Sequence, residues 1–252
     1  MFEPTMIFKP FGEEGPRVVL CGRSTGNWNV RNVQVDGDHK GNHGLFFNLN
    51  ILAGKYHFPD IFMPDPTSCN TMICHPEDLK ARIQDGIGSV TLWRGVKADG
   101  VVLPYGSTGA IATADCPTII AYCRAARMAI MAHSGMKSVT GGVVRSIVQK
   151  AQEYRFTTMG IFVTCGIAVR NYERVDIAPT LSERDGVIGN LVDVRKIISL
   201  KFGRYGVYGV MTDTVDTYGD LNKDRKPLWH SYRRGKTPAE KAGRNLVLVV
   251  NR

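Results

Sequence analysis

Two residues whose side chains could share a metal ion or a substrate lie close together in this chain. Cys116 ends the stretch Thr-Ala-Asp-Cys, and His133 begins the stretch His-Ser-Gly-Met-Lys 17 residues later. A cysteine can ionise to a thiolate that acts as nucleophile or ligand, and a neutral imidazole is a common metal ligand. The pair therefore predicts either a metal site or chemistry by a Cys-His dyad.

The neighbours of the pair favour a functional interpretation. Asp115 places a carboxylate in an apolar stretch, which is unfavourable unless the group is paired or functional. We expect Asp115 to orient His133 or, alternatively, to cap a backbone turn. Gly135, Gly141 and Gly142 stand at the start of a predicted helix, and helix N-termini favour anions.

The length and composition predict one globular domain over residues 1–252. A chain of 252 residues with 43% hydrophobic content can bury a substantial core. The N-terminal residues lack a basic segment followed by an apolar run, and no apolar stretch is long enough to span a bilayer. We therefore expect a cytoplasmic protein with no membrane partner.

The cysteines are scattered in a way that favours reduced thiols over disulfides. A chain of this size needs no disulfide staples, and Cys69 and Cys74 are too widely spaced for a structural zinc knuckle. The six cysteines are at positions 21, 69, 74, 116, 123 and 165.

Positive charge is concentrated near the C-terminus. The formal net charge is +9, and residues 195–252 hold 13 Lys and Arg against 5 Asp and Glu. Such a segment could bind nucleic acid or small anions such as phosphate, or form a solvated basic surface. Because no nucleic-acid-binding motif accompanies it, nucleic acid is the less favoured partner.

The apolar patterns predict more strands than helices. Strands are expected at 17–21, 89–93, 100–103, 110–113, 119–122, 128–132, 160–163, 207–211 and 246–250. Helices are expected at 79–83, 139–154 and 193–202, with a loop over 58–78 and a hairpin turn at Asp36-Gly37. Because many strands are joined by short turns, we predict an α+β fold with mixed sheets and flanking helices.

Four ordered motifs over residues 98–252 resemble the laccase-domain family, also known as multicopper polyphenol oxidases and as purine nucleoside phosphorylases. The family's Thr-Ala-Asp-Cys stands at 113–116, and its His-Ala-Gly-Trp-Arg-Gly is echoed by His133-Ser-Gly-Met-Lys-Ser138. Its Gly-Pro-x-Ile and Tyr-Glu are echoed by Thr164-Cys-Gly-Ile167 and Tyr172-Glu173. Its Phe-Ser-Tyr-Arg-Arg is echoed by His230-Ser-Tyr-Arg-Arg234, followed by Thr237 and Gly243-Arg244. The chain resembles a divergent member, since Met136-Lys137 replaces Trp-Arg and the family's Gln-Val-His-Gly is missing.

The resemblance implies a layered α/β/β/α fold and one zinc ion per chain, held by His, Cys and His. Cys116 and His133 match two of the family's ligands. The third is assigned to His75, with His57 and His43 as alternatives. Three protein ligands would leave a position for water or substrate, as in catalytic zinc sites. Copper is not expected, because six scattered histidines do not form the clusters that several coppers need.

The resemblance also implies phosphorolysis of purine nucleosides such as adenosine or inosine, with adenosine deamination in some members. The expected partners are then a purine nucleoside and inorganic phosphate. Phosphorolysis needs a cationic pocket for phosphate and stabilisation of an oxocarbenium-like centre. Tyr172 is expected to be structural, and Tyr232 to stack on a base or fill the core. The catalytic candidates are Cys116, His133, Lys137 and Arg233, and the substrate-binding candidates are Lys137, Tyr232, Arg233, Arg234 and Arg244.

Two other classes of function stay open on the sequence. Cys116 and His133 could form the thiolate-imidazolium dyad of a hydrolase. Alternatively, the protein could be a non-catalytic nucleotide or nucleic-acid binder that retained the fold and lost the chemistry.

Overall fold

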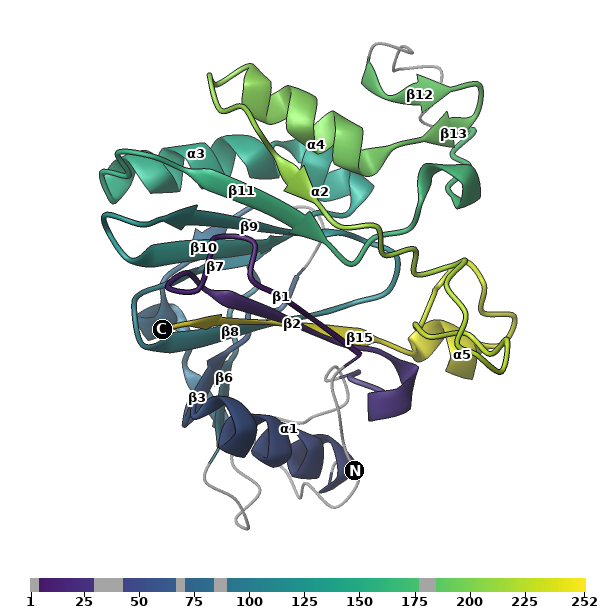
Figure 1. Cartoon of the computed structure of the whole chain (residues 1–252), viewed down its shortest axis with the longest axis horizontal. Helices are drawn as coiled ribbons and strands as arrows, with labels where there is room; N and C mark the ends of the chain where they lie inside the picture. Colours follow the sequence, from purple (N-terminus) through teal and green to yellow (C-terminus); the bar gives the residue numbers. More distant parts are fainter. Residues whose placement is uncertain (1–4, 30–42, 67–70, 84–89, 177–184) are drawn as a thin grey trace.

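A computed structural model describes residues 5–29, 43–66, 71–83, 90–176 and 185–252. Two β-sheets pack face to face, and helices cover the outer side of each sheet (Figure 1). One outer layer is α1 (His43–Tyr56), and the other contains α2 (Met136–Gly141), α3 (Val143–Glu153) and α4 (Val194–Gly203). This α/β/β/α layering confirms the predicted α+β fold.

The first sheet has seven strands, and its central strands are buried on both faces. In order across the sheet, they are β1 (Met6–Phe8), β2 (Arg17–Cys21), β15 (Asn245–Asn251), β8 (Ser107–Thr113), β3 (Asp60–Phe62), β6 (Thr91–Arg94) and β5 (Ala81–Ile83). Successive side chains of a strand point to opposite faces. Leu20 and Val247 accordingly pack between the sheets, whereas Val19 and Leu248 pack toward α1. Burial on both faces explains the uninterrupted apolar runs in β2 and β15.

The second sheet has six strands and follows the same rule. In order, they are β14 (Met211–Thr212), β11 (Gly160–Thr164), β9 (Thr118–Cys123), β10 (Met128–His133), β7 (Gly100–Leu103) and β4 (Ile73–Cys74). Ile120 and Met131 pack between the sheets, and Ile119 and Ile130 pack against the helices. The smaller elements are η1 (Arg23–Thr25), η3 (Pro76–Asp78), η4 (Val169–Asn171), the pair β12 (Val187–Ile188) and β13 (Leu191–Val192), and α5 (Pro238–Ala242).

Several predicted elements are confirmed. Strands lie at 17–21, 100–103, 119–122, 128–132, 160–163 and 246–250, as the apolar patterns predicted. The predicted helix over 193–202 is α4, and Asp193 is its N-cap residue, whose side chain accepts a hydrogen bond from the Lys196 amide.

Other predictions are wrong. Residues 81–83 form strand β5 instead of a helix, because they pair with β6, and the predicted loop over 58–78 contains β3 and β4. The predicted helix over 139–154 is two helices, since Gly142 adopts a left-handed conformation with φ 109° and caps α2. The strand expected over 207–211 is reduced to β14. Asp36-Gly37 lies outside the described residues.

Helix α1 was not predicted from the sequence at all. Its side chains Phe46, Leu49 and Leu52 are buried against the first sheet. In the part of the chain that the structure describes, no helix is both long and apolar enough to cross a membrane.

Candidate active site

The β9–β10 hairpin brings Cys116 and His133 together. Its antiparallel register places Thr118, the first residue of β9, opposite His133, so Cys116 lies two residues before β9 begins. The turn that carries Cys116 is fixed by a hydrogen bond from the Thr113 hydroxyl to the Cys116 carbonyl, at 2.6 Å. The hydroxyl of Ser134 donates to the Pro117 carbonyl at 2.7 Å and ties the two hairpin ends together. The predicted proximity of Cys116 and His133 is therefore explained by strand register.

Gly135 keeps a space open between the thiol and the imidazole. A Cβ atom at this residue would lie 2.9 Å from Sγ of Cys116, and 3.0 Å from Cε1 and 3.5 Å from Nε2 of His133. Both functional side chains thus border the same small volume, which a glycine leaves empty. A ligand or substrate atom placed there could contact both groups.

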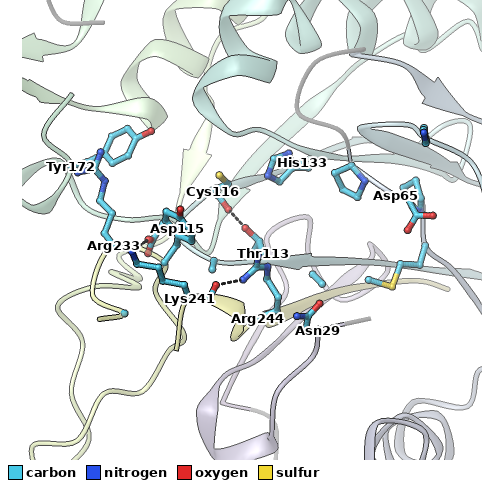
Figure 2. Close-up of a pocket in the computed structure, with 18 of the residues that line it drawn as sticks. Asn29, Asp65, Thr113, Asp115, Cys116, His133, Tyr172, Arg233, Lys241 and Arg244 are labelled. Carbon is cyan, nitrogen blue, oxygen red and sulfur yellow. Dashed lines mark hydrogen bonds between the residues drawn. The ribbon is translucent and has the colours of Figure 1, made fainter. Parts of the chain in front are cut away.

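Cys116 and His133 line a cleft of about 960 Å³, which is within the usual range for a small-molecule site. Figure 2 shows the two side chains next to each other in the middle of this cleft, with Tyr172 and Arg233 toward one end and Asp65 toward the other. The described residues that line the cleft include six basic side chains, Arg94, Lys97, Arg174, Arg233, Lys241 and Arg244. Only two carboxylates, Asp65 and Asp115, accompany them among the described lining residues.

The end of the cleft near Tyr172 combines cations with aromatic rings. The guanidinium of Arg233 lies over the Tyr172 ring, 4.6 Å from its centroid, and Arg174 donates to the Tyr172 hydroxyl at 2.9 Å. Nζ of Lys241 is 5.6 Å from the centroid of the Tyr232 ring. We call Tyr172, Arg174, Arg233 and Lys241 the cationic end of the cleft. Such a surface suits an anionic ligand.

Asp115 holds the loop that carries Arg233. Its backbone is left-handed, with φ 74°, and its side chain is buried. Oδ1 accepts a hydrogen bond from the Thr217 hydroxyl at 2.7 Å, and Oδ2 accepts one from the Arg233 amide at 2.9 Å. The expectation that Asp115 orients His133 is therefore corrected, because both oxygens bond to the C-terminal segment.

Burial and charge set the protonation of the groups in the cleft. Burial, followed by the repulsion from Asp115, raises the pKa of the Cys116 thiol to about 12. Burial also raises the pKa of Tyr172. The bidentate pairing with Arg174 lowers the pKa of Asp176 to about 2. At neutral pH the sulfur is thus a neutral thiol unless a bound cation displaces its proton.

The structure does not bring every candidate to this cleft. Nδ1 of His75 forms a hydrogen bond with the Tyr154 hydroxyl, and His75 does not line the cleft. Strand β4 runs past β7 so that Cys74 pairs with Val101, which carries the following His75 away from His133. His57 is exposed after α1 and also lies outside the cleft, and the His43 side chain is not among the described ones.

Two predicted cations also lie elsewhere. Lys137 is exposed on α2 and does not line the cleft. The guanidinium of Arg234 donates to the carbonyls of Tyr218 and Trp229, so it stabilises the C-terminal loop. Tyr232, Arg233 and Arg244 do line the cleft, and Tyr172, expected to be structural, lines it too.

The donor chemistry fits zinc only in part. A thiol sulfur and an imidazole nitrogen are preferred zinc ligands, and here they border one space. Among the described residues, however, no group of three or more His, Cys, Asp and Glu side chains is arranged to hold a metal ion. The described residues therefore offer at most two of the three protein ligands that a catalytic zinc requires.

Some lining residues had no clear signal in the sequence. Arg94, the last residue of β6, and Asp65, in the loop after β3, precede the motifs of residues 98–252 and form an ion pair. Lys241 could have been found, because Thr237 and Glu240 form a capping box that predicts a short helix, α5, just before Arg244. Arg174 directly follows the Tyr172-Glu173 motif, which was a usable signal.

Comparison with known families agrees with this arrangement. Residues 83–252 match the sequence model of the family described as multi-copper polyphenol oxidoreductase laccase. The chain belongs to this family. The matched region contains Cys116, His133 and the cationic end of the cleft, whereas Asp65 precedes it. No curated protein matches the sequence of this laccase-domain protein.

Solved structures share the fold along nearly the whole chain. YlmD from Geobacillus stearothermophilus has a TM-score of 0.71 and 20% identity, with 97% of this chain and 94% of that chain covered. The Neisseria meningitidis protein NMB0706 has a TM-score of 0.68 and 20% identity, with 98% of each chain covered. The hypothetical protein YfiH from Bacillus licheniformis has a TM-score of 0.66 and 15% identity, with 96% and 99% covered. At these identities the comparisons establish the fold of the laccase-domain protein.

Proposed function

We propose that this laccase-domain protein is a purine nucleoside phosphorylase that cleaves nucleosides of the adenosine or inosine type with inorganic phosphate. The observation that carries the proposal is the cationic end of the cleft, which lies beside Cys116 and His133. Laccase-domain proteins include purine nucleoside phosphorylases, and family membership supports this chemistry. The partners are then a neutral nucleoside and a phosphate anion.

The residues of the cleft suit the charges of this reaction. An oxygen of hydrogen phosphate forms a bond to C1′ of the ribose, and the bond from C1′ to the purine nitrogen breaks. The departing purine takes up the proton that hydrogen phosphate loses. Arg233 and Lys241 would bind the phosphate oxygens, and Asp115 fixes the backbone of Arg233 through its amide. The Arg233 guanidinium packs on the face of the buried Tyr172 ring. Arg244 lines the same cleft and adds positive charge.

We further propose one zinc ion per chain, with Cys116 and His133 as two of its ligands. A cysteine sulfur and a histidine nitrogen are typical ligands of zinc. The several copper ions that the family description implies would need clusters of histidines. A bound zinc would supply a Lewis acid. The three-ligand set with His75 is not retained, because His75 lies outside the cleft. Adenosine deamination is a separate activity that the same site could support.

The hydrolase alternative is less well supported. A nucleophilic cysteine needs a lowered pKa, whereas burial raises the pKa of Cys116 to about 12. A non-catalytic nucleotide binder would use the same cleft, so only a turnover experiment separates it from an enzyme.

Phosphate titration of two variants tests the proposed phosphate site. Arg233→Met should raise the phosphate KM by about 10- to 100-fold, since one hydrogen-bonded charge is lost. Lys137→Met removes a cation of the same sign outside the cleft and should leave the phosphate KM unchanged. Equal phosphate kinetics in Arg233→Met and the parent protein would contradict the assignment of the phosphate site.

A further inference from the structure

The two ends of the cleft present different groups. The cationic end holds Arg174, Arg233 and Lys241 (Figure 2), whereas at the opposite end the carboxylate of Asp65 is paired with Arg94. A phosphate anion therefore binds most favourably near Arg233, if the proposed function holds. The nucleoside that phosphate attacks then extends from the middle of the cleft toward Asp65.

Asp65 is a well-positioned acceptor at that end. Its amide donates to the Val96 carbonyl at 2.9 Å, and its Oδ1 accepts a hydrogen bond from the guanidinium of Arg94. The Arg94 side chain is only 8% exposed, so the pair is anchored in the protein, whereas the Asp65 side chain is 36% exposed. Among the described residues, none donates to Oδ2 of Asp65. The ion pair thus fixes the carboxylate and leaves one oxygen for a ligand.

The other lining carboxylate is less accessible to a ligand. Asp115 is buried, and both of its oxygens accept hydrogen bonds, from the Thr217 hydroxyl and the Arg233 amide. Of the described carboxylates in the cleft, Asp65 is therefore the better placed to bind a substrate. An ionised carboxylate accepts hydrogen bonds and cannot donate them, so it recognises N–H groups.

We propose that Asp65 determines the base specificity of the cleft by accepting a hydrogen bond from an N–H group on the Watson-Crick edge of a purine. The 6-amino group of adenine and the N1–H of a 6-oxopurine both provide this donor. Unsubstituted purine riboside provides only an acceptor nitrogen there. The inference rests on the proposed function and assigns Asp65 a role as a specificity-determining residue.

Calorimetric binding of adenosine and of purine riboside, without phosphate, tests this role. The parent protein should bind adenosine more tightly than purine riboside. In Asp65→Asn the amide oxygen can still accept from Arg94, which turns the NH2 group toward the base. Adenosine affinity should then fall by about 10- to 100-fold, because two donors face each other, while purine riboside affinity stays the same or rises.

Asp60→Asn serves as the matched control. Asp60 is the first residue of β3, accepts a hydrogen bond from the Trp93 indole at 2.7 Å and does not line the cleft. The Asp60→Asn variant should leave the ratio of the two affinities unchanged. A parallel loss of both ligands in Asp65→Asn, or unchanged adenosine binding, would overturn the role of Asp65 alone. A parent protein that binds neither nucleoside would overturn the proposed function together with this inference.

Discussion

Replacing Gly135 with alanine tests whether the space between Cys116 and His133 is used. The backbone of Gly135 has φ −61° and ψ 160°, which alanine adopts without strain. The added methyl group would lie 2.9 Å from the Cys116 sulfur and 3.0 Å from Cε1 of His133, well inside normal contact distances of about 3.5–4.0 Å. The methyl group therefore occupies the position from which a metal ion or substrate atom would contact both side chains.

The expected loss of stability is small compared with the loss of function. Overpacking of this kind costs about 1–3 kcal/mol, and replacing a glycine at a compatible φ returns about 0.4–1 kcal/mol. Since about 1 kcal/mol shifts the Tm of a chain this long by about 2–4 °C, Gly135→Ala should still fold and melt within about 10 °C of the parent. Zinc content and nucleoside turnover should both fall at least about 10-fold.

A second glycine provides the control for Gly135→Ala. Gly54 lies inside α1, and a Cβ atom there would meet no heavy atom within 4 Å. Gly54→Ala should stabilise the protein by about 1 kcal/mol and leave zinc content and turnover unchanged. If Gly135→Ala kept the zinc content and turnover of the parent, the space between the thiol and the imidazole would have no function, and the reasoning would be refuted.

Three further predictions follow from buried polar groups. Asp115→Asn keeps the left-handed backbone, which asparagine tolerates, but turns an amide group toward the Thr217 hydroxyl or the Arg233 amide. The phosphate KM should therefore rise about 10-fold. An unchanged KM would show that Asp115 does not position Arg233. Arg195→Met leaves the buried Asp213 carboxylate without the guanidinium that pairs with it. The free energy of unfolding, measured in urea, should fall by about 3–5 kcal/mol. Lys196 is exposed, so Lys196→Met should change that free energy little. Burial lowers the pKa of His230 below its usual value, so in mildly acidic solution the unfolded chain binds more protons than the folded one. The stability that His230 contributes should be complete above about pH 6.5 and fall as the pH is lowered. This fall should be smaller in His230→Gln, and an equal pH dependence of Tm in the two proteins would contradict the role of His230.

The sequence predicted the part of the site that depends on local order. The short apolar runs at 119–122 and 128–132 predicted the two strands that are now β9 and β10, and the register of their hairpin explains why Cys116 and His133 meet. The motifs near the C-terminus likewise marked Tyr232, Arg233 and Arg244 as cleft residues. Cys116 and His133 are close in the sequence to the strands that position them, whereas Tyr232, Arg233 and Arg244 were found through the family motifs.

The sequence could not predict contacts that depend on how distant strands pair. His75 was chosen as the nearest counterpart of the family's Gln-Val-His-Gly motif, but the parallel pairing of β4 with β7 directs it to Tyr154. Lys137 was expected in the pocket because it follows His133 closely, yet the rotation of α2 leaves it exposed. Asp65 and Arg94 reach the cleft only because β3 and β6 lie side by side in the first sheet. Tertiary packing decided these positions.

The central claim is tested most directly by following the products formed from adenosine or inosine by the purified protein, with and without inorganic phosphate. Phosphorus NMR should show ribose 1-phosphate accumulating in step with the free purine base, and turnover should stop when phosphate is removed. Equal turnover without phosphate, giving free ribose or giving inosine from adenosine, would contradict phosphorolysis and identify hydrolysis or deamination as the activity of this cleft.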